Sequence, residues 1–175
     1  MSADRMQRST WALPRVLACA VLAVFAASAH AQDAKKQAED LMRQGQQQMS
    51  KGQPRDAVKT LGKAIEIDPT RSELYMLRSR ARDSSGRFEE ALDDATKYIE
   101  LEPTDEYGYL NRARIYLSLE KPEKALDDAN KAIEMKPNEP DGYYRRADAY
   151  SAMNKDAEAK ADEKKADELD AAARR

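Results

Sequence analysis

Two pairs of adjacent carboxylates are the residues of this chain best suited to chemistry. Asp93-Asp94 and Asp127-Asp128 are 34 residues apart in the sequence. Neighbouring carboxylates can act as a general acid and base, or they can ligate a divalent cation. Both pairs recur at the same place in a repeating, charged helical pattern. We therefore expect them to lie on outward helix faces and to be solvated.

Other catalytic groups are scarce. The chain has one cysteine, Cys19, and one histidine, His30, and both precede residue 32. If that segment is removed, Ser-His-Asp or Cys-His catalysis is impossible, and so is a zinc site made of cysteine and histidine. Glycine-rich phosphate-binding patterns are also missing from the sequence. We therefore expect no enzyme, no catalytic residues, no metal and no cofactor.

The first 31 residues have the pattern of a secretory signal peptide (1–31). Arginines near the start are followed by an uncharged stretch from Val16 to Ala29, and Ala29-His30-Ala31 has small residues around one variable position. This order is typical of a cleaved signal, so the mature chain is predicted to begin at Gln32. The uncharged stretch is shorter than the roughly 20 residues that span a bilayer. No stable membrane insertion is expected after cleavage.

Two alternatives for this segment stay open. One is an uncleaved membrane anchor, and the other is a lipoprotein signal, because Val16-Leu17-Ala18-Cys19 resembles a lipobox. Cys19 follows Arg15 by only four residues and the apolar stretch continues beyond it, so ordinary cleavage is favoured. Export by such a signal predicts the periplasm of a Gram-negative cell, with secretion as the alternative.

The charge of the chain is balanced. It has 30 basic and 32 acidic residues, a net charge of −2, and both signs are interspersed along the sequence. Nucleic-acid binding usually needs a concentrated basic face, so no nucleic acid is expected as a partner. The chain is 35% charged and 41% hydrophobic with few glycines and prolines, which favours helices around a core.

The helices that carry these residues recur every 34 residues. Within one unit, apolar residues three or four apart mark two helices, and a proline ends the second because its ring cannot continue a helix. The period therefore predicts helix–turn–helix units. Five columns keep this interval: Pro69, Pro103 and Pro137; Tyr75, Tyr109 and Tyr143; Ala57, Ala91, Ala125 and Ala159; Gly45, Ser79, Ala113 and Ala147; and Ala64, Tyr98, Ala132 and Ala166.

This pattern resembles the tetratricopeptide repeat (TPR), a family with the same period. The first unit departs from the family by glutamines in its first helix, and the fourth by a charged second helix without a closing proline. The resemblance implies an all-α, right-handed helical solenoid whose last helix is a polar cap. It divides the chain into an array over 32–173 with units at 38–71, 72–105, 106–139 and 140–173, and a tail at 174–175.

The resemblance also implies a binding surface. In this family the first helices of the units line a concave groove that receives a peptide or a partner protein. At the matching positions this chain has apolar, aromatic and basic residues, which suit peptide recognition. The predicted partner-binding residues are Met76, Leu77, Arg80, Tyr107, Leu110, Asn111, Arg114, Tyr144 and Arg145.

Some family members hold a terminal carboxylate in a clamp of lysine, arginine and asparagine. Asn111 and Arg145 match clamp positions, whereas Met76, Arg80 and Asp141 depart from them. The full clamp is absent, and the remaining hypothesis is that the groove arginines favour an acidic peptide. The alternative is that these arginines pair within the fold with Glu73, Asp83, Asp141 and Asp148.

Together these patterns predict a non-catalytic adaptor or scaffold that binds a protein or peptide. Two alternatives stay open. End-to-end stacking of the terminal units would make a structural homo-oligomer, so self-association is a second prediction. A glycan or another small ligand is the third, because Tyr107, Leu110 and Tyr144 would form a surface on which sugars can stack.

Overall fold

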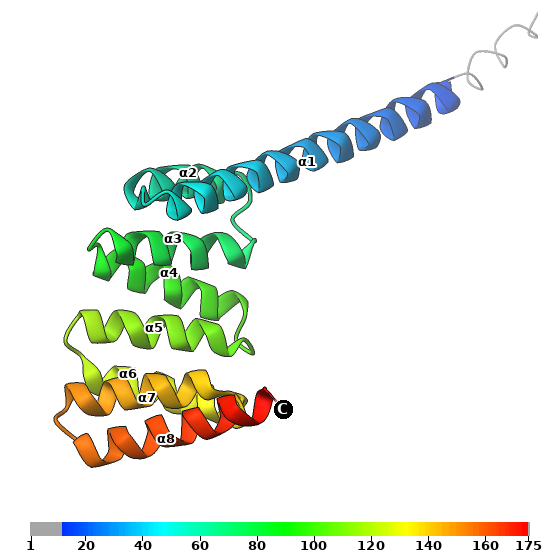
Figure 1. Cartoon of the computed structure of the whole chain (residues 1–175). Helices are drawn as coiled ribbons and strands as arrows, with labels where there is room; N and C mark the ends of the chain where they lie inside the picture. The colour runs from blue at the N-terminus through cyan, green and yellow to red at the C-terminus, as the bar shows by residue number, and fades with distance from the viewer. Residues whose placement is uncertain (1–11, 175) are drawn as a thin grey trace, which may run out of the picture.

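The chain folds into a stack of helix pairs. The computed structural model describes the backbone of residues 12–174 and the side chains of residues 31–174. This part of the chain contains helices and no strands (Figure 1), so the predicted all-α solenoid of about four helix–turn–helix units is confirmed. The helices are α1 (Ala12–Ser50), α2 (Pro54–Ile67), α3 (Ser72–Ser84), α4 (Phe88–Leu101), α5 (Glu106–Ser118), α6 (Pro122–Met135), α7 (Pro140–Ala152) and α8 (Asp156–Ala173).

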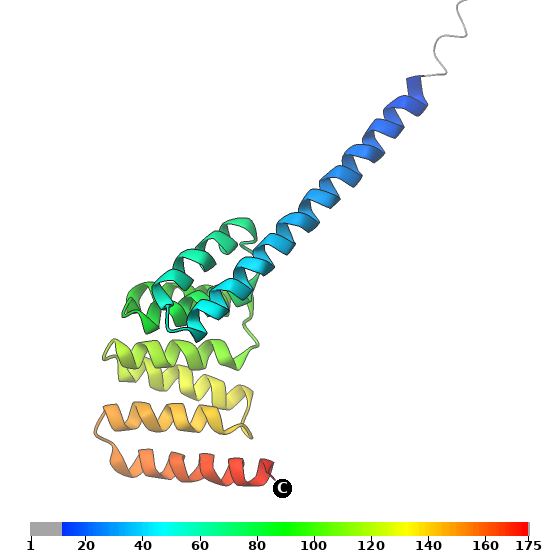
Figure 2. The ribbon, with the colours of Figure 1, turned by 45° about the horizontal axis from the view of Figure 1, so that its top comes forward.

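The odd-numbered helices form one layer of the stack. Each helix packs against the next along the chain, and α1, α3, α5 and α7 also contact one another in series. The first helices of all four units therefore share one face, and the views in Figures 1 and 2 show the units following one another along the stack. This layer positions the binding surface.

The N-terminal part of α1 extends beyond the stack (Figure 2). Residues 1–11 of the predicted signal peptide lie outside the described residues, and residues 12–31 are the first part of α1. The first buried residue of α1 with a described side chain is Ala38, so a cut after Ala31 would spare the packing of α1. Among the described helices, none has the length and apolar character to cross a membrane. The signal peptide stays a prediction.

Small residues let the helices approach closely. The predicted alanine column is buried, with Ala57, Ala91 and Ala125 at 0% exposure and Ala159 at 3%. At Gly108, a Cβ would lie 2.8 Å from Cγ1 of Ile99, closer than packed atoms come. These contacts exclude larger side chains and fix how tightly successive helices stack.

A cluster of polar and aromatic side chains ties the second unit together. Arg78 donates two hydrogen bonds to the carboxylate of Asp94, at 2.8 and 2.7 Å, and Arg82 donates another at 2.6 Å. The guanidinium of Arg78 lies 5.9 Å from the ring centroid of Tyr75. The hydroxyl of Tyr75 donates to the carbonyl of Pro69 at 3.0 Å. The cluster thus joins α3 to α4 and to the turn that precedes α3.

The cluster recurs with the sequence period. Its Tyr–Pro hydrogen bond explains why the tyrosine and proline columns keep a constant separation of six residues. The first unit lacks it, because Leu41, Gln44 and Thr60 stand at the equivalent positions. The members are Pro103, Tyr109, Arg112 and Asp128 in the third unit, and Pro137, Tyr143, Arg146 and Asp162 in the fourth.

The prediction that the paired carboxylates are solvated is wrong for one member of each pair. Asp94 and Asp128 are only 3% and 6% exposed, because each faces an arginine on the preceding helix. Asp93 and Asp127 are exposed, as expected. Each pair therefore has one structural carboxylate and one surface carboxylate, and the two are not placed as an acid–base pair.

Each unit turns from its first to its second helix through a residue with positive φ. The φ angles are 70° at Gly52, 77° at Gly86, 54° at Glu120 and 58° at Asn154. Glycine adopts this left-handed conformation without steric cost, and asparagine tolerates it. A glutamate there brings its Cβ too close to the backbone. Glu120 is therefore a strained position in the third unit.

Replacing Asp128 by asparagine should lower the free energy of unfolding by about 3 kcal/mol, because the partly buried Arg112 loses its countercharge. Replacing the adjacent Asp127, which is exposed, by asparagine should change it by less than about 0.5 kcal/mol. Urea unfolding followed by circular dichroism measures both. Equal losses for the two variants would contradict the structural role of Asp128.

Replacing Glu120 by glycine should raise the free energy of unfolding by about 1 kcal/mol, since glycine relieves the left-handed strain. Replacing Asn154 by glycine should have a smaller effect, because asparagine already tolerates this conformation. Thermal melts of both variants against the unchanged chain test this order. A lower melting temperature for the Glu120→Gly protein would show that the strain is not where we place it.

Candidate binding groove

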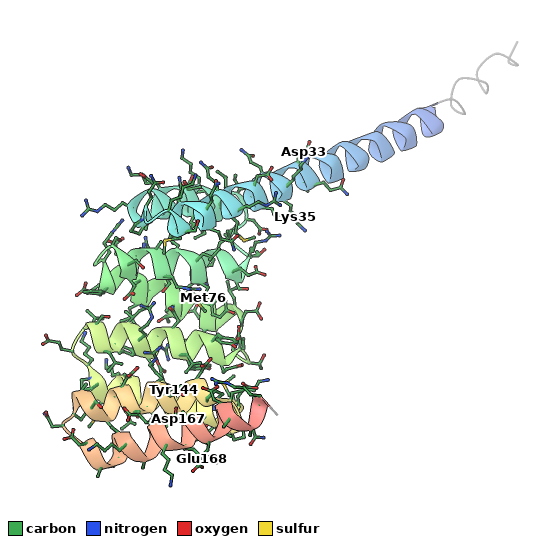
Figure 3. All side chains as sticks on the ribbon, in the orientation of Figure 1. Asp33, Lys35, Met76, Tyr144, Asp167 and Glu168 are labelled. Carbon is green, nitrogen blue, oxygen red and sulfur yellow. The ribbon has the colours of Figure 1, made fainter. Side chains whose placement is uncertain are left out.

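A groove of about 470 Å³ crosses the layer of odd-numbered helices. Most of its wall comes from the helices α3, α5 and α7, and α4 and the turn before α5 complete it. Met76 on α3 and Tyr144 on α7 are labelled in Figure 3. The groove is lined by Met76, Arg80, Tyr98, Asp105, Tyr107, Leu110, Asn111, Arg114, Asp141, Tyr144 and Arg145.

The structure brings eight of the nine predicted partner-binding residues together in this groove. The ninth, Leu77, lines an adjoining pocket of about 350 Å³ with Gln46, Met49 and Arg80. Leu110 and Asn111 are 8% and 9% exposed, so they form the groove floor and offer little surface to a partner. Whether these residues bind a partner stays a prediction.

Three lining residues lie outside the predicted partner-binding set, namely Tyr98, Asp105 and Asp141. Asp105 accepts a hydrogen bond from the backbone N–H of Tyr107 at 3.0 Å and so caps α5. An acidic residue just before a predicted helix is a recognisable capping signal, and it could have identified Asp105. The hydroxyl of Tyr98 donates to the other oxygen of Asp105. From the sequence, Tyr98 was assigned only to one of the five periodic columns, but its side chain also lines the groove.

A hydrogen-bond network under the groove connects the second and third units. Asn111 donates to Oγ of Ser79 at 2.9 Å, and Ser79 donates to the carbonyl of Ala91 at 2.9 Å. Arg114 donates to the side-chain oxygen of Asn111 at 3.1 Å and forms an ion pair with Asp83 of α3. Asn111 and Arg114 are therefore held by the fold before any partner arrives.

The groove arginines differ in how far the fold neutralises them. Arg114 pairs with Asp83, and Arg145 donates to Asp148 at 2.8 Å. Arg80 is exposed and forms no ion pair with any described residue. Pairing within the fold, which was one alternative from the sequence, thus occurs for two of the three arginines.

Tyr144 links α7 to the last helix. Its hydroxyl lies 2.8 Å from the carboxylate of Asp167 and 3.0 Å from that of Asp170. The hydrogen bond to Asp167 is the largest cause of a raised pKa of Tyr144. The phenol therefore keeps its proton, and its ring is fixed at the groove wall next to Arg145.

The side chains of the groove are suited to binding a ligand. The described residues contain no group of three or more His, Cys, Asp or Glu side chains that could hold a metal ion. The groove instead presents exposed aromatic and aliphatic surface, a guanidinium at Arg80 and carboxylates at Asp105 and Asp141. Such a surface binds by charge complementarity, hydrogen bonds and apolar contact.

A stack of helix pairs with a groove across its first helices defines an α-helical solenoid repeat protein. Sequence models of the tetratricopeptide repeat match residues 72–105, 107–139 and 140–172, which together are more than half of the chain. The chain belongs to the tetratricopeptide repeat family. These repeats are typically non-catalytic modules for protein interaction. No curated protein matches the chain.

Solved structures resemble the chain over most of its length. A crystal structure of MamA is 28% identical with a TM-score of 0.69, over 76% of this chain and 78% of that one. TTC0263, a thermophilic TPR protein from Thermus thermophilus, is 20% identical with a TM-score of 0.69, over 75% and 74%. The first TPR domain of Spaghetti (RPAP3), bound to the HSP90 peptide SRMEEVD, is 22% identical with a TM-score of 0.64, over 69% and 95%. The family fits a protein-interaction scaffold, and these structures share its fold.

Titration of the tyrosines should show that Tyr98 deprotonates late. Burial, followed by its hydrogen bond to Asp105, raises the pKa of Tyr98 above the usual 10.0. The folded state therefore favours the protonated phenol, and this contribution to stability is fully present below pH 10 and is lost as the pH rises further. Because the pKa of Tyr144 is also raised, absorbance at 295 nm should show late phenolate formation that is smaller by one tyrosine in the Tyr98→Phe variant. A Tyr98 titrating near pH 10 would contradict this.

Proposed function

We propose that the protein is an exported, non-catalytic adaptor that holds an extended peptide segment of a partner protein in its groove. The observation that carries this proposal is the groove itself, in which eight predicted contact residues converge from three rigid helices. A site on packed helices keeps its side chains in fixed positions, which reduces the entropy lost on binding. The half-buried Met76 and the exposed Arg80 and Tyr107 supply the contacts.

The chemistry of the groove supports a partner with an acidic group. Arg80 forms no ion pair with a described residue, whereas Arg114 and Arg145 do. A guanidinium binds carboxylates through two parallel hydrogen bonds. The Spaghetti (RPAP3) domain, which has the same fold, is bound to a peptide with two adjacent glutamates and a final aspartate. We extend this only to the class of ligand, an extended peptide with an acidic group.

The two alternatives from the sequence have less support. End-to-end stacking needs apolar end surfaces, but the last helix exposes charged residues such as Glu163 and Lys164. A glycan or other small ligand usually binds in a more enclosed pocket than this groove. Self-association and sugar binding therefore rank behind peptide binding.

Export is the second part of the proposal. A cut after Ala31 would leave Gln32 at the start of α1 and would remove none of the buried residues described in that helix. In a Gram-negative host, osmotic-shock fractionation should place the protein in the periplasm. Sequencing of its N-terminus should then read from Gln32. A cytoplasmic protein that still begins at Met1 would refute this part.

Site-specific crosslinking tests the adaptor role. A photoreactive amino acid at Met76 lies in the groove, whereas the same group at Asp93 lies exposed on α4. We expect one partner to be captured from Met76 and not from Asp93 when cells are irradiated. Leu110, which also lines the groove, is unsuitable because it is 8% exposed and substitution would disturb the packing.

The contribution of the Arg80 charge is tested by adding the Arg80→Glu substitution to the protein that carries the crosslinker at Met76. The exposed position tolerates the change, so the fold should be preserved, and circular dichroism verifies this. Loss of the captured partner would support binding through Arg80. Capture of the same partner from Asp93 as efficiently as from Met76 would move the binding site away from the groove.

A further inference from the structure

The ring of Tyr107 is the exposed aromatic surface of the groove. Tyr107 is 57% exposed, the one large hydrophobic residue with such exposure in the described chain. It lies in the first turn of α5, where its backbone N–H is held by the carboxylate of Asp105 at 3.0 Å. The groove wall therefore fixes the base of this side chain while its ring faces solvent.

Most tyrosines of this chain already have a cation over the ring. Five of the eight, Tyr75, Tyr109, Tyr116, Tyr143 and Tyr150, have an arginine or lysine within 6.0 Å of the ring centroid. Two others, Tyr98 and Tyr144, direct their hydroxyls to aspartates. Among the described residues, Tyr107 has neither kind of partner. Its ring is open to a cation from outside the chain.

The surroundings of this ring are negatively charged. Asp141 is the largest cause of a raised pKa of Tyr107, followed by partial burial and then by Glu106, Glu139 and Asp105. None of these four carboxylates forms an ion pair with a described residue. No cation of the described residues therefore balances the negative charge at the start of α5 and α7.

The uncompensated charge of the groove changes sign along its length. Arg114 and Arg145 are paired within the fold, which leaves Arg80 on α3 as the positive group. Asp105 and Asp141, from the starts of α5 and α7, are the negative groups that line the groove. A partner that complements the whole surface must carry an acidic group and, apart from it, a cationic group.

We infer that the partner segment places a lysine or arginine side chain over the ring of Tyr107, between the carboxylates of Asp105 and Asp141. This inference rests on the proposed function and specifies the chemistry of its ligand. A cation over an aromatic face, close to carboxylates and partly shielded from water, improves affinity about tenfold. A purely acidic peptide, which the groove arginines alone would favour, would pair with Arg80 but would leave the carboxylates of Asp105 and Asp141 without a cation.

A peptide array tests this with the full-length chain. The probes are ten-residue alanine–glycine peptides, each with one lysine and one glutamate. The set of peptides covers every combination of positions for these two residues. The tightest peptide is then labelled with fluorescein, and its affinity is measured by anisotropy with lysine and again with N-acetyl-lysine, which lacks the charge. We expect acetylation to weaken binding to the unchanged protein about tenfold.

Variants locate the effect. Acetylation should weaken binding by less than about twofold for the Tyr107→Leu and Asp141→Asn proteins, because these have already lost one part of the cation site. The Asp127→Asn protein, which loses an exposed carboxylate outside the groove, should keep the full tenfold difference. Circular dichroism and melting temperature verify that each variant is folded.

The outcomes separate the inference from the proposed function. Peptide binding that Arg80→Glu abolishes but that lysine acetylation leaves unchanged would overturn the inference and keep the groove as a peptide site. An acetylation effect of equal size in the Tyr107→Leu and unchanged proteins would also overturn it. If no peptide of the array binds, the groove is not a peptide site, and both fail together.

Discussion

The buried ion pair between the two helices of a unit is the interaction on which the rest of this structure depends. In the second unit, the Arg78 guanidinium is held by Asp94 and lies against the Tyr75 ring, whose hydroxyl reaches back to Pro69. A single arginine thereby fixes the two helices of one unit and the turn from the preceding unit. Buried ion pairs of this kind stabilise a fold little more than well-packed apolar side chains in the same place would. They do, however, permit few other arrangements of the helices that carry them. We interpret the ion pair as an interaction that fixes the relative position of the two helices in a unit. All helices that line the groove belong to units with this ion pair, so the ion pairs also determine the shape of the groove.

The groove shows how the same side chains can support the fold and present a surface. Arg114 extends from α5 to Asp83 on α3, and it also holds the amide of Asn111, so it joins two units while lining the groove. A charge used in this way is no longer free for a partner. The charge that a groove offers to a partner therefore cannot be read from its residue types alone. It depends on which of the charged side chains already form ion pairs within the fold.

The architecture could be predicted from the sequence because its causes are local and periodic. Proline columns mark where second helices end, and alanine columns mark where helices touch, so the period and the fold class follow from residue types alone. The lining residues of the groove could be proposed because helix register fixes which positions share a face. The buried role of Asp94 had a signal that was missed: it lies three residues after Ala91 and four before Tyr98, on the packed face of α4. The pairing of Arg114 with Asp83 was one of two alternatives from the sequence, and residue types alone could not decide between them, since residues 31 apart meet only through the particular side-chain conformations of two packed helices.

The first unit has no Arg–Asp cluster, and this has a consequence for how the array opens. In a solenoid each unit is held only by its own contacts and by its neighbours, so local opening can begin at one end. The first unit has a neighbour on one side only, and it relies on apolar packing around Leu61 and Leu74. The fourth unit also has one neighbour, but Arg146 and Asp162 hold its helices together. We therefore expect the two ends of the stack to differ in local stability, with opening from the N-terminal end and with backbone amides of α1 and α2 exchanging with solvent before those of α7 and α8.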